Sequence, residues 1–185
     1  MRNLLSRGDF VVRAGTVVAG LGAAGSAFSV TGSVARAADA EISHTAEAIH
    51  QVVDFAASPE RVYRALTTTE GFDKAVRLSA AVRSGMVSGT APTQIDPRPG
   101  GAFSLFGGYV TGRILELQPN ARIVEAWRSA SWDLGLYSIA TFALAPQGTG
   151  TRLTFDHVGF PNGAAPTLAK GWQENYWDPL AKSLT

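Results

Sequence analysis

Apolar and polar residues alternate over several segments of the chain, which predicts β-strands because successive side chains of a strand point to opposite faces. In the first such segment, 49–55, the residues Ile49, Val53 and Phe55 fall on one face. Further strands are predicted at 102–106, 109–117, 122–129, 137–144 and 151–159. The turns between most of them are short, so we expect an antiparallel sheet.

Two short helical segments are predicted after the first strand. Ser58 followed by Pro59 is a helix start signal, because serine caps a helix and proline suits its first position. Apolar residues then recur at helical spacing, which predicts a helix over 59–67 and a second short turn over 72–76. The following segment, 77–99, is interrupted by glycines and prolines and is predicted to be a loop with one short strand. A lid over a cavity is the alternative, because long loops are often functional.

The C-terminal segment changes to a spacing of four residues. Its apolar stripe consists of Leu168, Trp172, Tyr176, Leu180 and Leu184, which is the pattern of a buried helix face. Pro179 cannot donate a backbone hydrogen bond, so a kink is expected near Asn175. The predicted fold class is therefore α+β, with a curved antiparallel sheet wrapped around a long C-terminal helix. Such an arrangement tends to enclose a cavity, and a cavity suggests a ligand.

The first 37 residues have the three parts of an export signal. A basic region containing Arg2, Arg7 and Arg13 precedes an apolar region at 14–34, and Ala-Arg-Ala follows at 35–37. We expect cleavage after Ala37 and export to the periplasm or the cell exterior. The predicted organisation is a signal peptide (1–37), a tether (38–48) and one folded domain (49–185).

Two alternatives concern this N-terminal region. An apolar stretch of about 20 residues is long enough to be a retained membrane anchor, although glycines and the cleavage box favour a signal peptide. The segment 6–11 resembles the twin-arginine export box, but Gly8 replaces its second arginine. Twin-arginine export and general secretion therefore both stay open.

Removal of the signal changes the charge balance of the chain. The whole sequence has 16 Lys and Arg against 15 Asp and Glu, whereas the mature domain keeps 12 basic and 14 acidic residues. No basic surface for nucleic acid or anionic lipid is expected, so we predict no nucleic-acid partner and no membrane partner after cleavage. The sequence has no cysteine, which excludes disulfides and thiolate chemistry.

Three phrases carry a family resemblance that covers about 49–184. They are GGAFSLFGGYVTGRILELQPNARIVEAWR (100–128), GTRLTFDHVGFP (150–161) and GWQENYWDPLAKSL (171–184). They resemble the SRPBCC (START-like) superfamily, and specifically proteins similar to the activator of the heat-shock protein 90 ATPase. The resemblance implies a helix-grip fold with a deep cavity for an apolar small molecule, and it implies no shared catalytic residue.

The sequence departs from the named co-chaperone in two ways. It carries an export signal, whereas that activity needs a cytosolic chaperone, and no separate N-terminal chaperone-binding domain is expected before residue 49. Fold resemblance alone does not fix function. A chaperone contact is therefore disfavoured as the role of this chain.

Aromatic residues of the late strands and the terminal helix are candidates for lining the cavity, because they offer stacking and apolar area to a ligand. The expected lining residues are Trp127, Trp132, Tyr137, Trp172 and Tyr176, together with His157 and Glu125. Plain core packing is the alternative for each aromatic side chain, a hydrogen-bonded core position is the alternative for His157, and an exposed cross-strand charge is the alternative for Glu125.

No catalytic motif is found in the sequence. Ser88 has the wrong offset for a nucleophile elbow, and the histidines do not have metal-ligand spacing. We expect no metal and no cofactor, and we expect a hydrophobic small-molecule binding protein rather than an enzyme. A co-chaperone or interaction module is one alternative, and a cyclase or hydrolase that uses Glu125 or His157 as acid or base is the other.

Overall fold

The computed structural model describes residues 46–85 and 92–185. The strands of these residues are β1 (Ala46–Phe55), β2 (Gln94–Ile95), β3 (Ala102–Leu105), β4 (Val110–Gln118), β5 (Arg122–Ser129), β6 (Ser138–Gln147) and β7 (Gly150–Pro161). They form one antiparallel sheet in the order β1-β7-β6-β5-β4-β3-β2. The predicted α+β fold with an antiparallel sheet is confirmed.

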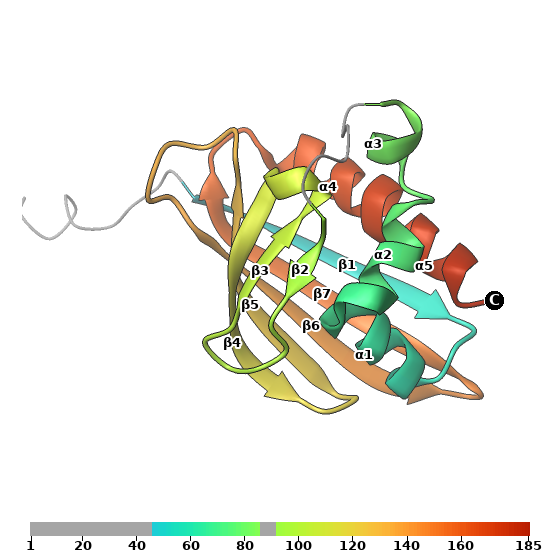
Figure 1. The fold of residues 1–185 in the computed structure, drawn as a ribbon. Helices are drawn as coiled ribbons and strands as arrows, with labels where there is room; N and C mark the ends of the chain where they lie inside the picture. The colour runs from blue at the N-terminus through green and yellow to red at the C-terminus, as the bar shows by residue number, and fades with distance from the viewer. Residues whose placement is uncertain (1–45, 86–91) are drawn as a thin grey trace, which may run out of the picture. The chain divides into compact units, whose positions relative to one another are not determined.

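Helices occur in two groups along the chain. The first group is α1 (Pro59–Thr67), α2 (Thr69–Val76) and α3 (Ala80–Arg83), and the second is α4 (Ala165–Trp172), the π-helical turn η2 (Gln173–Trp177) and α5 (Asp178–Ser183). A short 3-10 turn, η1 (Phe106–Gly108), separates β3 from β4. The second group forms one continuous rod that lies along the sheet, with α2 beside its C-terminal part (Figure 1).

The N-terminal segments of the sequence interpretation fall mostly outside the described residues. The predicted signal peptide at 1–37 lies there, and so does most of the predicted tether. Strand β1 begins at Ala46, earlier than the predicted residue 49, and pairs along its whole length with β7. The last tether residues therefore belong to the sheet.

The helix start at Ser58 and Pro59 is confirmed. Ser58 has an extended backbone, and its hydroxyl accepts a hydrogen bond from the Arg61 N–H at 3.4 Å. This satisfies one of the N–H groups that the first helical turn leaves without a partner. Helix α1 then has the predicted bounds, whereas α2 begins before the predicted residue 72.

The segment predicted as a loop at 77–99 contains the short strand β2 and also the helix α3, which was not predicted. Ser79 caps α3 by accepting from the Val82 N–H at 3.2 Å. The Asn175 side chain accepts from the Ala81 N–H at 2.8 Å. A helix of four residues is too short to form alone, so this tertiary contact explains why sequence periodicity did not predict it.

The pairing of β4 with β5 includes a β-bulge. Ile114 lies opposite Glu125, and Gln118 lies opposite Arg122. The register shifts between Ile114 and Glu116, and the bulge inserts one extra residue into β4.

The terminal helix is irregular at the place where Pro179 was expected to disturb it. The irregularity is the π-helical turn η2, in which the Asp178 N–H bonds to the Gln173 carbonyl. Pro179 then lies in the first turn of α5, where a missing N–H costs nothing. The wider turn brings Tyr176 and Trp177 to the core, where both are buried.

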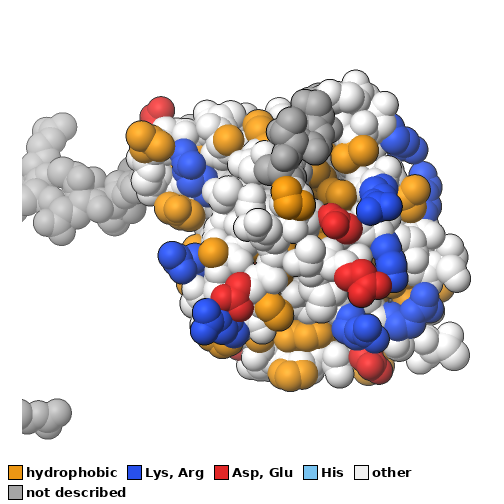
Figure 2. All heavy atoms as spheres, viewed as in Figure 1, with side chains coloured by type: hydrophobic (Ala, Val, Ile, Leu, Met, Phe, Trp, Pro, Cys, Tyr) orange, Lys and Arg blue, Asp and Glu red, His pale blue; other side chains and the backbone are white. Residues whose placement is uncertain are grey.

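The surface of the described residues carries mixed charge. Figure 2 shows basic and acidic side chains interspersed over the viewed face. Several form exposed pairs, such as Arg152 with Asp54 at 2.8 Å. None of the helices in 46–85 and 92–185 has the length and apolarity that crossing a membrane requires.

Two glycines provide a matched test of the packing. A Cβ at Gly112 would overlap the Ala126 carbonyl and the Phe103 ring, so Gly112→Ala is expected to lower the free energy of unfolding by about 1–3 kcal/mol. A Cβ at Gly171, in helix α4, would meet no atom within 4 Å. Gly171→Ala is therefore expected to raise stability by about 0.5–1 kcal/mol. Urea unfolding measures both, and equal effects of the two substitutions would contradict this packing.

Candidate functional site

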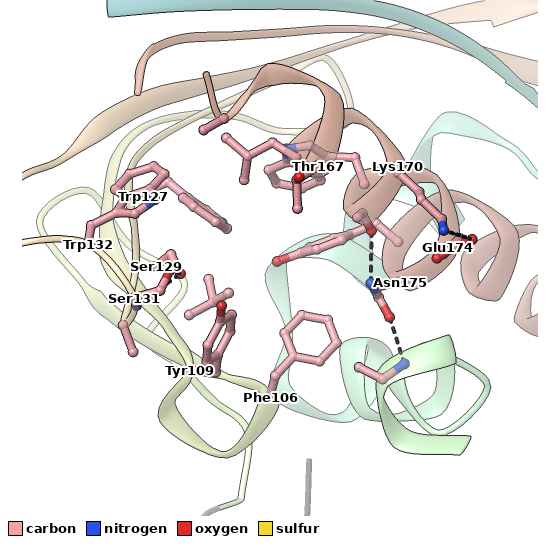
Figure 3. Close-up of a pocket in the computed structure, with 18 of the residues that line it drawn as sticks. Phe106, Tyr109, Trp127, Ser129, Ser131, Trp132, Thr167, Lys170, Glu174 and Asn175 are labelled. Carbon is pink, nitrogen blue, oxygen red and sulfur yellow. Dashed lines mark hydrogen bonds and ion pairs between the residues drawn. The ribbon is translucent and has the colours of Figure 1, made fainter. Parts of the chain in front are cut away.

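A cavity of about 950 Å³ lies between the η1, β4 and β5 side of the sheet and the terminal helix (Figure 3). Its lining comprises Ala81, Phe106, Gly107, Gly108, Tyr109, Val110, Trp127, Ser129, Ala130, Ser131, Trp132, Ala164, Thr167, Leu168, Lys170, Gly171, Trp172, Glu174, Asn175 and Tyr176. The volume is within the range of small-molecule sites. Small residues on both walls leave this space unfilled.

Aromatic rings form much of the inner wall. Trp127 of β5 contacts Trp132 and Trp172, with ring centroids 5.3 and 5.7 Å apart. Trp172 in turn packs on Tyr176 at 4.1 Å. These four residues were predicted to line a cavity, and the structure brings them together around one.

Both walls also carry polar groups. Tyr109, Ser129 and Ser131 lie on the same side as Trp127 and Trp132, and Thr167, Lys170, Glu174 and Asn175 lie on the helical side (Figure 3). The Ser129 and Ser131 hydroxyl oxygens are 2.8 Å apart, and an ion pair joins Lys170 to Glu174 at 3.7 Å. The cavity therefore offers aromatic rings and hydroxyl groups on both its sheet side and its helical side.

Sequence reasoning missed Phe106 and Tyr109, which the turn η1 places on the cavity wall. Phe106 has a positive φ of 52°, which is uncommon for a bulky residue. Gly107 and Gly108 follow with φ values of 68° and 90°. The Gly-Gly pair between two aromatic residues was the available signal in the sequence, because glycines favour left-handed backbone and such conformations cluster at functional sites.

Tyr137 lies outside the cavity lining. It precedes β6 in the loop after β5, and 53% of its surface is exposed. Its predicted position in the pocket depended on β6 starting at residue 137. The strand begins at Ser138 instead, so the tyrosine belongs to the loop.

His157 is fully buried but does not line the cavity. The Trp172 indole N–H donates to its Nδ1 at 3.0 Å, and its Nε2 lies 2.6 Å from the Ser138 hydroxyl. An indole nitrogen can only donate, so Nδ1 accepts and Nε2 carries the proton that is donated to Ser138. The Ser138 hydroxyl donates to the Trp127 carbonyl at 3.0 Å. A satisfied chain of hydrogen bonds thus joins α4 to the central strands.

This network does not suit His157 for proton abstraction. Burial lowers the pKa of His157 to about 4, because the low-dielectric core disfavours the imidazolium. Its Nε2 already carries a proton toward Ser138, whereas activation of a serine needs an unprotonated nitrogen there. The hydrogen-bonded core position that the sequence left open is what the structure has.

Glu125 lies on the concave face of the sheet, between the buried residues Ile114 and Ala140 of the adjacent strands. Its carboxyl makes no hydrogen bond with any side chain in the described part of the chain. Burial raises its pKa to about 8. The core therefore holds this carboxyl in its neutral form near pH 7. It is not part of the cavity lining, although it lies on the same strand face as Trp127, which is.

No group of three histidine, cysteine, aspartate or glutamate side chains that could hold a metal ion is found among residues 46–85 and 92–185. The lining itself offers aromatic rings, hydroxyl groups, the Asn175 amide and the Lys170–Glu174 ion pair.

Comparison with known proteins identifies the family. The family model described as "Activator of Hsp90 ATPase homolog 1-like protein" matches residues 56–185. The chain belongs to this family. The predicted SRPBCC (START-like) resemblance is thereby confirmed, and the observed sheet and terminal helix are those of its helix-grip fold.

Individual relatives of this Hsp90-activator-like domain cover the same region. A solved structure of an HSP90 activator from Plasmodium falciparum is 23% identical, has a TM-score of 0.60, and matches 70% of this chain and 89% of that one. The human activator of 90 kDa heat shock protein ATPase homolog 1 is 28% identical over 130 residues, which are 70% of this chain. An uncharacterized Schizosaccharomyces pombe protein is 40% identical over 90 residues, which are 49% of this chain. The matches span 35% of the human protein and 27% of the yeast one, about a third of their length.

The His157 network predicts a pH-dependent difference in stability. His157→Phe leaves the Trp172 N–H without an acceptor, whereas the Ser138 hydroxyl keeps its bond to the Trp127 carbonyl. At pH 7 we therefore expect the free energy of unfolding to fall by about 1–3 kcal/mol. Between pH of about 6.5 and 4 the unfolded wild-type chain binds a proton that the folded chain does not, so wild-type stability falls as pH decreases. The wild-type advantage over His157→Phe should therefore shrink by about 3 kcal/mol across that window.

Wild type must be compared with His157→Phe because the titration of Glu125 changes the stability of the wild type with pH in the opposite direction. Its raised pKa makes the folded chain the stronger proton binder from about pH 4.5 to 8, so its contribution is lost as pH rises. Both proteins contain Glu125, so its contribution cancels in the difference between their free energies of unfolding, which urea unfolding measures. His50→Gln, which removes an exposed imidazole, is the control. A difference between wild type and His157→Phe that stays constant with pH would show that the pKa of His157 is the same in the folded and unfolded chains.

Proposed function

We propose that this chain binds an apolar or aromatic small molecule in the cavity between β4, β5 and the terminal helix, and releases it unchanged. The observation that carries the proposal is the cavity itself, with a volume of about 950 Å³ and walls built from Trp127, Trp172 and Tyr176. The cavity is partly open to solvent. A concave, largely apolar space of this size with a few polar groups is typical of a small-molecule site.

The polar groups support binding rather than catalysis. Both ring nitrogens of His157 are engaged, and neither His157 nor Glu125 is part of the lining. Hydroxyl groups of Ser129, Ser131 and Thr167 lie along the wall, where they can orient a ligand. The charged side chains that do line the cavity, Lys170 and Glu174, are joined in an ion pair at 3.7 Å. A cyclase or hydrolase would need an acid or a base that is free to exchange a proton with the bound molecule.

Gly171 allows the proposal to be tested by filling the cavity. Its missing side chain faces open space within the lining, so Gly171→Leu should occupy the cavity without displacing the core. We expect the affinity for phenylnaphthylamine, measured by its fluorescence, to fall at least about tenfold, while the midpoint of thermal unfolding is retained. Gly171→Ala is the matched control and should bind nearly as the wild type does.

Two results would count against ligand binding. One is a folded wild-type chain that binds neither this probe nor any compound from a lipid and metabolite extract, as judged by native mass spectrometry. The other is a Gly171→Leu variant with unchanged affinity. The second result would place the bound probe elsewhere on the protein.

We also propose that the mature chain is exported. The support is the basic, apolar and Ala-Arg-Ala succession that ends at Ala37. Expression in a bacterial host should give a mature chain that starts at Ala38 outside the cytoplasm, as measured by fractionation and N-terminal sequencing. Ala37→Phe should leave the chain uncut, because a bulky residue does not fit the cleavage position.

Contact with a heat-shock chaperone is the second candidate function. It is favoured by the similarity to the human activator of 90 kDa heat shock protein ATPase homolog 1. The match covers only 35% of that protein, and an exported chain would be separated from a cytosolic chaperone. A full-length chain that stays in the cytoplasm in the export experiment would favour this second candidate.

A further inference from the structure

Unsatisfied polar atoms gather at one place in the otherwise apolar interior. Among the buried side-chain nitrogen and oxygen atoms of residues 46–85 and 92–185, those without a hydrogen-bond partner are Trp127 Nε1, Arg128 Nε and Tyr176 Oη. Two of these three residues, Trp127 and Tyr176, are part of the cavity wall. Buried polar groups are nearly always paired in folded proteins, so such a concentration requires an explanation.

The two unsatisfied groups lie close to each other and to a carboxyl. Burial raises the pKa of the Tyr176 phenol far above its ordinary value, the Trp127 indole opposes this rise, and the Glu125 carboxylate adds to it. These influences act only at short range. The indole and the phenol nevertheless lack the geometry of a hydrogen bond. Glu125 is two residues from Trp127 on the same strand face, about 7 Å along the strand.

The cavity gives access to this place. Trp127 and Tyr176 both line it, so a small group of a ligand in the cavity lies next to both side chains. Glu125 is not part of the lining.

The two groups share one chemical property. The Trp127 indole can only donate, and the Tyr176 phenol is a donor that stays protonated. An anion would lose its hydration in this interior, so it is disfavoured. A neutral oxygen with two lone pairs can accept from both donors.

We infer that the part of the cavity beside Trp127 and Tyr176 holds the oxygen of the ligand, so that the ligand is an apolar or aromatic molecule with an uncharged carbonyl group at its buried end. This inference rests on the proposed binding function and specifies its ligand class. The aromatic wall takes the hydrocarbon part, and the two donors take the carbonyl oxygen. A hydrocarbon of the same shape leaves the donors without a partner.

Three probes with one ring skeleton test the inference on the folded chain. They are acetylnaphthalene, ethylnaphthalene and naphthylethylamine, which carry a carbonyl, a methylene and an ammonium group at the same place. We expect isothermal titration at pH 6 to give about tenfold tighter binding of the ketone than of the hydrocarbon. Tyr176→Phe removes only the phenol oxygen, so it should erase most of this preference while the hydrocarbon affinity is retained.

Tyr109→Phe is the matched control. It removes a tyrosine hydroxyl from the same cavity but from a half-exposed ring, 52% accessible, next to Ser129 and Ser131. The preference for the ketone should survive this substitution. Circular dichroism and thermal unfolding verify that each variant is folded.

The outcomes distinguish a failure of the carbonyl preference from a failure of small-molecule binding. Equal binding of ketone and hydrocarbon, or a preference lost in Tyr109→Phe but kept in Tyr176→Phe, would overturn the inference and leave small-molecule binding intact. Tightest binding of the amine would also overturn it, because Glu125 would then act as a carboxylate that pairs with a cation. Failure of all three probes to bind the folded wild-type chain would remove the proposed function and this inference together.

Discussion

The docking of Trp172 on the sheet is the interaction on which the site depends. Its indole is 2% exposed and packs on Phe155 at 4.4 Å and on Tyr176 at 4.1 Å. A buried indole N–H without an acceptor would oppose this docking, and His157 supplies the acceptor. The other ring nitrogen donates to the Ser138 hydroxyl, which in turn donates to the Trp127 carbonyl of β5. One hydrogen-bonded chain thus fixes the terminal helix against the strand that carries Trp127 and Glu125.

The same helix fills one end of the interior and leaves the other open. Trp177 and Leu180 are almost wholly buried and belong to the dense part of the core. On the other side of Trp172 the helix presents Gly171, and the facing turn presents Gly107 and Gly108. Residues without side chains at these positions prevent closure of the space. The cavity is therefore a consequence of where small residues fall around a firmly anchored tryptophan, since anchoring stops the helix from collapsing onto the sheet.

The polar content of the interior shows two different solutions to burial. His157 has partners for both ring nitrogens, and its depressed pKa reflects the stability of the neutral ring. Glu125, Trp127 and Tyr176 lack such partners within the described residues, and the carboxyl avoids charge by keeping its proton. The hydrogen bonds of His157 are complete without a ligand. The unpaired groups of Trp127 and Tyr176 need a partner from outside the chain, and this need bears on ligand specificity.

Much of the fold could be predicted because its elements rest on local periodicity and turn chemistry. The alternation at 49–55, the Ser58-Pro59 start and the apolar stripe through Trp172 each indicate an element from a few neighbouring residues. The bulge in β4, the helix α3 and the engagement of His157 depend on partners far along the chain, such as Asn175 for α3. The sequence alone determined the α+β class, the antiparallel sheet, the family and most of the aromatic wall. Only the tertiary structure decided which polar side chains are satisfied and where space remains, because hydrogen bonds and packing between distant segments leave no periodic trace in the sequence.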